Sequence, residues 1–219
     1  MKKIIITMTL CFGTMIIFGQ NEKYVKAMEQ KIAALDTTRN TVALQGLAND
    51  FERIAIAEKT EWLPFYYAAL ANVNMGYSMM ENAMGGDASK IDPVSDKAEA
   101  LLKQAEALKK ENSELYVVKK MINSLRMIVD PQNRFMQYGP LAQQALDKAR
   151  QLNPDNPRIY LLEGQDKFYT PEQFGGSKTE AKKLFETALQ KFETYKLENP
   201  LDPNWGRGMT QYFLAEANK

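Results

Sequence analysis

A helical sequence pattern stops at Asp-Pro or Asn-Pro in four places along this chain and then starts again. The clearest case is Asn-Pro-Asp-Asn-Pro at positions 153–157, because helical sequence flanks it on both sides. Asp and Asn side chains accept hydrogen bonds from the free N–H groups at a helix start, and Pro in the first turn loses no hydrogen bond. Similar pairs occur at Asp92-Pro93, Asp130-Pro131 and Asp202-Pro203. We therefore expect a series of directly connected helices.

The sequence between these breaks favours helix throughout. Runs rich in Ala, Leu, Glu, Lys and Gln recur, and no segment alternates apolar and polar residues for long. Ser177 and Glu180 have the spacing of a capping box, and Gly85-Gly86, Gly139-Pro140 and Gly175-Gly176 indicate turns. The predicted helices are Glu22–Leu35, Thr38–Glu58, Glu61–Met84, Pro93–Glu111, Glu114–Val129, Leu141–Leu152, Pro157–Tyr169, Lys178–Glu198 and Pro203–Ala217.

The N-terminus has the pattern of a secretory signal peptide. Lys2 and Lys3 precede an apolar stretch at positions 4–18, and the sequence turns polar after Gly19. The stretch is shorter than the ~20 residues that a membrane-spanning helix needs. We therefore predict a signal peptide at residues 1–20, a single helical domain at residues 21–219, and no integral membrane span after cleavage.

Composition excludes several classes of site. Two of the 28 Lys and Arg residues lie in the leader, so the remaining chain has 26 basic and 27 acidic residues. This balance gives no reason to expect nucleic acid as a partner. The sequence contains no His, and its one Cys, Cys11, lies in the leader. We therefore expect no disulfide, no metal site, no haem ligation and no His-based catalytic triad.

A short pattern of small and large residues recurs between the breaks. Ala142, Leu146 and Ala149 are spaced as A-x3-L-x2-A, Pro154 follows five residues later, and Tyr160 and Gly164 are spaced as Y-x3-G in the next helix. Small residues let two helices approach closely at a crossing, and the large residue fills the space opposite. The same spacing is found at Ala98, Leu102 and Ala105, and at Ala181, Phe185 and Ala188.

This pattern resembles the tetratricopeptide repeat, a helix–turn–helix unit of ~34 residues. The spacing between copies here is longer, because Gly85–Asp92, Asp130–Gly139 and Thr170–Gly176 add length. The resemblance implies an all-α fold, namely an α-solenoid of three to four tetratricopeptide-like helical hairpins with a C-terminal capping helix. It extends to small secreted tetratricopeptide-like proteins of Gram-negative bacteria, which implies a periplasmic location and a binding role.

From this resemblance we expect a scaffold that binds a protein or peptide and has no enzymatic activity and no cofactor. The alternative is a small-molecule-binding accessory protein of an envelope transport or assembly system. In tetratricopeptide proteins the first helix of each unit lines the concave face. The candidate binding residues at such positions are Tyr67, Glu114, Ser124, Arg158 and Gln165.

Other clusters are better explained by packing than by chemistry. Met75, Met79, Met80 and Met84 could bind Cu(I) through thioethers, but methionine also fills gaps between helices. The loop TPEQFGGS, residues 170–177, lacks the Lys of a phosphate-binding loop. Glu163 and Asp166 lie on one helix face, where solvated charges are more common than a pair of catalytic carboxylates.

Overall fold

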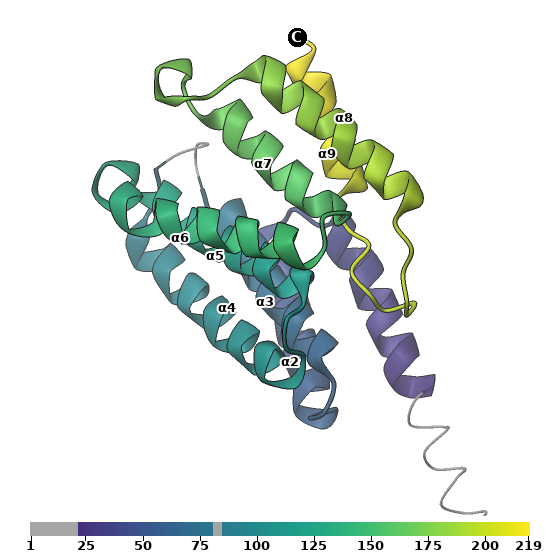
Figure 1. The fold of residues 1–219 in the computed structure, drawn as a ribbon. Coiled ribbons are helices and arrows are strands. Elements are labelled where there is room, and N and C mark those ends of the chain that lie inside the picture. Colours follow the sequence, from purple (N-terminus) through teal and green to yellow (C-terminus); the bar gives the residue numbers. More distant parts are fainter. Residues whose placement is uncertain (1–21, 81–84) are drawn as a thin grey trace, which may run out of the picture.

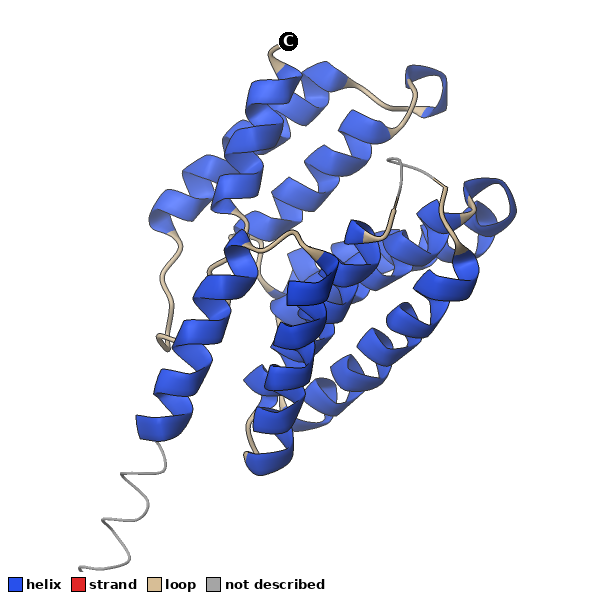
Figure 2. Ribbon diagram, turned by 180° about the vertical axis from the view of Figure 1, so that it is seen from behind, coloured by secondary structure: helices blue, strands red, loops and turns tan. Residues whose placement is uncertain are grey.

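The computed structural model describes residues 22–80 and 85–219, and all the regular structure in these ranges is helical (Figure 1, Figure 2). The first helix covers residues 22–37. It is followed by α2 (Thr41–Ala57), α3 (Trp62–Ser78), α4 (Ala88–Leu108), α5 (Ser113–Val129), α6 (Pro131–Leu152), α7 (Pro157–Tyr169), the short 3-10 helix η1 (Glu172–Phe174), α8 (Lys178–Thr194) and α9 (Arg207–Ala217). The predicted all-α fold is confirmed.

Helices that follow one another in the sequence pack as hairpins. α2 packs with α3, α3 with α4, α5 with α6, and α7 with α8. Figure 1 shows these pairs arranged in chain order, and α9 lies against α8 at the end of the stack. The molecule is therefore a solenoid-like stack of helical hairpins that ends in a C-terminal helix, as the sequence predicted.

The recurring small residues lie where the helices cross. All members of the three A-x3-L-x2-A copies are buried, and Ala98, Ala105, Ala149, Ala181, Phe185 and Ala188 are fully so. Gly164 faces the Phe185 ring, and a Cβ atom built on Gly164 would lie 2.5 Å from Phe185 Cε1. The pattern therefore marks the close approach of α7 and α8.

Two prolines that were expected to precede or start helices lie inside them. α4 begins at Ala88, after the cap Asp87, and contains Pro93. α6 begins at Pro131 and continues through Pro140 to Leu152, so the predicted start at Leu141 is wrong. Ser89 and Met136, whose carbonyls lose the usual i+4 donor, are exposed residues, where water can supply the missing hydrogen bond.

The end of the chain also differs from the prediction. α8 ends at Thr194 and α9 begins only at Arg207, so residues 195–206 form a non-helical connection, which we call the strap. Gly206 adopts a left-handed conformation at the start of α9, with φ of 105°, where a side chain would be strained. In Figure 1 the strap runs from α8 back beside the first helix.

Two sequence predictions fall outside the described residues. The predicted leader, residues 1–20, lies in the N-terminal part that the structure does not describe, and Met84 lies in the gap at 81–84. The leader therefore stays a prediction. Within residues 22–80 and 85–219, no helix combines the length and the hydrophobicity needed to cross a bilayer.

Candidate functional site

Three of the five predicted binding residues meet in one buried cluster beneath the strap. Tyr67, Glu114 and Arg158 come from α3, α5 and α7, and they are 1%, 4% and 0% exposed. The Tyr67 hydroxyl donates a hydrogen bond of 2.9 Å to the carbonyl of Leu201 in the strap. Arg158 donates to the carbonyl of Pro203 in the same segment. The strap of this chain therefore already binds these groups.

Glu114 and Arg158 form the centre of this cluster. Arg158 Nη1 lies 3.0 Å from Glu114 Oε1, and the same carboxylate accepts hydrogen bonds from Tyr66 at 3.0 Å and from Asn156 at 2.6 Å. Burial raises the pKa of Glu114, and Arg158 and these two donors oppose that effect. Each polar atom of the carboxylate thus has a protein partner, which is how a buried charge is tolerated.

The indole of Trp205 closes the cluster from the strap side. Its Nε1 donates to the Tyr66 hydroxyl at 2.8 Å, and its ring lies 5.3 Å from the Arg158 guanidinium carbon. The next residue, Gly206, donates its N–H to Asp36 Oδ1 of the first helix at 3.3 Å. The strap therefore joins the C-terminal part of the chain to α3, α7 and the first helix.

The other two predicted binding residues lie outside this cluster. Ser124 is 6% exposed on α5, and its hydroxyl has no hydrogen-bond partner among the described residues. Gln165 is half-buried on α7, and its Nε2 lies 3.4 Å from the sulfur of Met209. A role for these five residues in ligand contact stays a prediction.

The remaining sequence clusters have structural partners. Tyr67, one of the candidate binding residues, is 1% exposed, whereas the neighbouring aromatic residues Trp62 and Phe65 are half-buried. Met75 is 2% exposed and belongs to the core. In the α7–α8 connection, a Cβ atom on Gly176 would lie 1.7 Å from the Thr170 carbonyl oxygen, so this glycine allows a tight turn.

The two carboxylates considered for catalysis form ion pairs with basic residues. Glu163 Oε2 lies 2.6 Å from Arg150, and Asp166 Oδ1 lies 2.7 Å from Lys120. Each pair joins α7 to a neighbouring helix. Packing and pairing therefore account for both residues.

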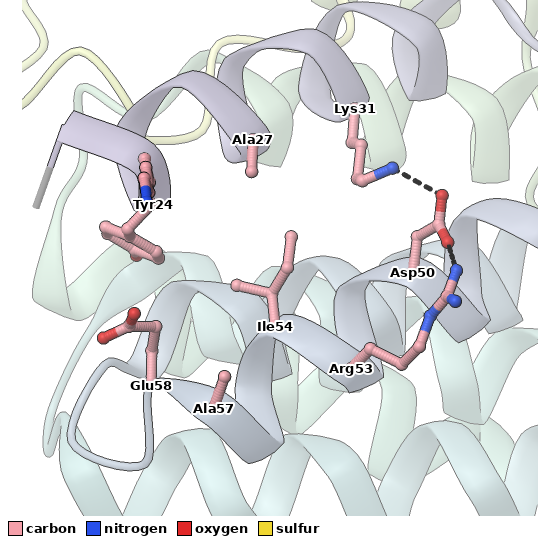
Figure 3. A pocket seen from close by; sticks show the side chains of 9 residues that line it. Tyr24, Ala27, Lys31, Asp50, Arg53, Ile54, Ala57 and Glu58 are labelled. Carbon is pink, nitrogen blue, oxygen red and sulfur yellow. Dashed lines mark hydrogen bonds and ion pairs between the residues drawn. The ribbon is translucent and has the colours of Figure 1, made fainter. Parts of the chain in front are cut away.

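An open groove of about 420 Å³ lies between the first helix and α2 (Figure 3). Figure 3 shows Ala27 projecting from the first helix toward Ile54 of α2, and Lys31 projecting toward Asp50. Two of the facing residues are alanines, and their small side chains leave space between the helices. The volume is within the range of roughly 300–1,000 Å³ that is typical of small-molecule sites.

The groove combines an apolar floor with charged ends. Its apolar lining comes from the Tyr24 ring and the two alanines together with Ile54, and its charged lining consists of Lys23, Lys31, Asp50, Arg53 and Glu58. Three of these charged residues are basic and two are acidic, so the lining has a small excess of positive charge beside an apolar floor that an apolar molecule could cover.

Tyr24 provides a side wall of the groove and has an unusual hydroxyl. The oxygen is buried and has no hydrogen-bond partner among the described residues. Burial, with the nearby carboxylates of Glu61 and Glu58, raises the pKa of Tyr24 far above that of a free tyrosine. The phenol is therefore neutral, and it is the aromatic ring that contributes to the groove.

Sequence reasoning missed the groove. Its residues come from two helices that lack the repeat pattern, and no motif joins them. The one local signal is the i,i+3 spacing of Asp50 and Arg53, which indicates an ion pair on many helix surfaces and is not specific for a ligand.

Comparison with solved structures finds a likeness over most of the chain. The chain is similar to the HusA haemophore from Porphyromonas gingivalis, with a TM-score of 0.76 and 32% sequence identity over 89% of this chain and 92% of that one. This chain belongs to the HusA family. No protein-family model matches this chain, and no curated protein matches it. The resemblance to tetratricopeptide repeats is therefore supported at the level of helical hairpins and not by a match to that family.

This relationship corrects the predicted function. HusA is described as a haemophore, which is a carrier of a small molecule and not a peptide-binding adaptor. The prediction of a protein- or peptide-binding scaffold for this HusA-family chain is therefore wrong. The finding favours the alternative, a small-molecule-binding accessory protein. The relative is a binding protein and not an enzyme.

Proposed function

We propose that this protein binds haem or a closely related tetrapyrrole and carries it outside the cytoplasm. The observation that supports this most strongly is the similarity to the HusA haemophore over nine-tenths of both chains. The predicted leader agrees with export. The proposed binding site is the groove between the first helix and α2, because it combines an apolar floor with basic residues.

The residues of the groove fit the parts of a haem molecule. Haem has a flat apolar ring, which can lie over Ala27, Ile54 and Ala57, and two carboxylate groups, which basic side chains attract. The sequence contains no His, and the lining of the groove contains neither His nor Cys. The prediction that no side chain ligates haem iron therefore stays untested, and the proposed binding rests on contacts with the ring and the carboxylates, which need no iron ligand.

A titration with haemin tests this function and its site. We expect a saturable change in the Soret absorbance of haemin on addition of the protein. Ala57→Asp places a charge on the floor of the groove and should weaken haemin binding by at least about tenfold, because the charge would lie beneath the apolar ring.

The matched control is Ile56→Asp, one residue away on the same helix. Ile56 is 68% exposed and does not line the groove. Haemin affinity in this control should stay within about twofold of the original protein. Equal weakening in both variants would place the ligand elsewhere, and the absence of saturable binding to the unmodified protein would refute the function itself.

Secretion is the second part of the proposal. The pattern at positions 1–20 predicts that the protein from its native host begins at Gln20 or Asn21 and lies in the periplasm. The mass of the protein recovered from that compartment tests the cleavage. Recovery of the chain with Met1 intact in the membrane fraction would contradict it.

A further inference from the structure

Asp50 lies at one end of the groove, where two basic side chains from different helices meet its carboxylate. Lys31 of the first helix donates to Asp50 Oδ2 at 2.5 Å. Arg53, one turn further along α2, donates to Oδ1 of the same group. Figure 3 shows both basic side chains converging on this carboxylate from opposite sides.

The surroundings of Asp50 are those of a carboxylate-binding site. The Asp50 and Lys31 side chains are only 25% and 29% exposed, whereas Arg53 is 77% exposed. The hydrogen bond from Lys31, together with Arg53, lowers the pKa of Asp50, so the carboxylate is charged at neutral pH. The apolar floor formed by Ile54 and its neighbours begins beside this cluster.

We propose that Asp50 is an internal competitor for the carboxylate of the ligand, and that the ligand binds with this group at Lys31 and Arg53 while its apolar body covers the groove floor. This inference rests on the proposed function, because it assigns the recognition of the anionic part of the ligand to that groove. It also names Asp50 as the residue that sets how strongly the anionic part is recognised.

The exchange of one carboxylate for another is chemically feasible at this position. Arg53 is largely exposed and has further N–H donors in its guanidinium group, so it can bind a second carboxylate beside the first. Ion pairs of exposed side chains contribute little to stability, so Arg53, which is 77% exposed, can exchange Asp50 for another carboxylate at small cost. A ligand carboxylate would then have both cations as partners, as Asp50 has in the free protein.

The test compares haemin with haemin dimethyl ester, in which both carboxylates are blocked. Asp50→Asn keeps the size of the side chain and one acceptor oxygen but removes the charge that competes. We expect Asp50→Asn to bind haemin about three- to tenfold more tightly than the original protein, and to bind the ester with unchanged affinity. Lys31→Gln and Arg53→Gln should each weaken haemin binding by a similar factor and leave the ester unaffected.

Glu58→Gln is the matched control, because Glu58 also lines the groove but is not part of this cluster. An equal gain in Asp50→Asn and Glu58→Gln would show a general effect of charge and overturn the proposal. The proposal would also be wrong if Asp50→Asn weakened haemin binding or changed haemin and ester alike. These outcomes overturn only the role of Asp50, provided that the unmodified protein binds haemin. If the unmodified protein does not bind haemin, both the proposed function and the role of Asp50 are refuted.

Discussion

Gly164 lies at a helix crossing with no room for a methyl group. A Cβ atom there would lie 2.5 Å and 2.8 Å from two carbons of the Phe185 ring. Phe185 is fully buried and stacks on Phe213 of α9, with ring centroids 5.6 Å apart. The ring therefore cannot move aside without disturbing the contact between α8 and α9.

We expect Gly164→Ala to lower the free energy of unfolding by about 1–3 kcal/mol, because it overpacks this crossing. Gly46 provides a control in which the same substitution should raise the free energy of unfolding. It lies inside α2, and an added Cβ atom there meets nothing within 4 Å. Gly46→Ala should stabilise the protein by roughly 0.5–1 kcal/mol, since alanine favours helix. Urea unfolding of both variants measures the two effects, and a Gly164→Ala protein as stable as the original would contradict the assigned crossing.

At the scale of single helices, the caps show what local sequence can and cannot predict. Asn156 accepts a hydrogen bond from the Arg158 N–H at 3.0 Å and precedes Pro157, as the sequence predicted. Ser177 also caps its helix, since its hydroxyl accepts from the Glu180 N–H at 3.2 Å. The expected capping box, however, is only half formed.

The Glu180 carboxylate does not return to the cap. It lies 2.8 Å from Lys167, and the Ser177 N–H donates instead to the Lys167 carbonyl at 2.9 Å. These partners lie on α7, so tertiary contacts have replaced the local pair. The spacing of Ser and Glu could not predict this, because Lys167 becomes a neighbour only when the hairpin forms.

This geometry changes the expected energetics of the α8 cap. Ser177→Ala should lower the free energy of unfolding by about 0.5–2 kcal/mol, because the Glu180 N–H loses its acceptor. Glu180→Ala should have a smaller effect that adds to the first, since the Glu180 carboxylate pairs with Lys167 and does not accept from the Ser177 N–H. A double-mutant cycle measures the coupling. Strong coupling between the two changes would indicate that the full capping box forms in solution.

At the scale of the whole molecule, the sequence predicted that helical hairpins stack in chain order, but it did not predict the contacts between the strap and the helices at the start of the chain. The periodic small residues report contacts between helices that follow one another, and those contacts are present. The strap instead joins residues far apart in the chain, such as Gly206 with Asp36 and Trp205 with Tyr66. No local pattern encodes such pairs. The sequence predicted a helix from Pro203, where the structure has the end of the strap.

The candidate site was unpredictable for the same reason. Lys31 lies on the first helix, and Asp50 and Arg53 lie on α2, so their convergence depends on how these two helices pack. The predicted residues Tyr67, Glu114 and Arg158 do converge, but on the strap of the chain itself. The repeat pattern thus predicts which residues share a face and does not predict what covers that face.

The strap should hold the first helix in place, and Trp205 is its main anchor. The indole is 7% exposed, donates to Tyr66 and lies over Arg158, so Trp205→Ala removes a ring from a filled space. We expect a loss of about 3–5 kcal/mol in the free energy of unfolding. Because Gly206 links the strap to Asp36, hydrogen exchange of the amides in residues 22–37 should accelerate more than exchange in α5 and α6.

Trp62→Ala provides the control for this local effect. Trp62 is half-buried at the start of α3 and packs edge-on against Tyr66, with ring centroids 5.6 Å apart, but it makes no hydrogen bond to the strap among the described residues. Its loss should lower stability without a selective gain of exchange in residues 22–37. If both variants raise exchange in the first helix by the same factor relative to α5 and α6, the strap does not position that helix. In that case Trp205→Ala should leave haemin affinity unchanged. If the strap does support the groove, Trp205→Ala should lower haemin affinity.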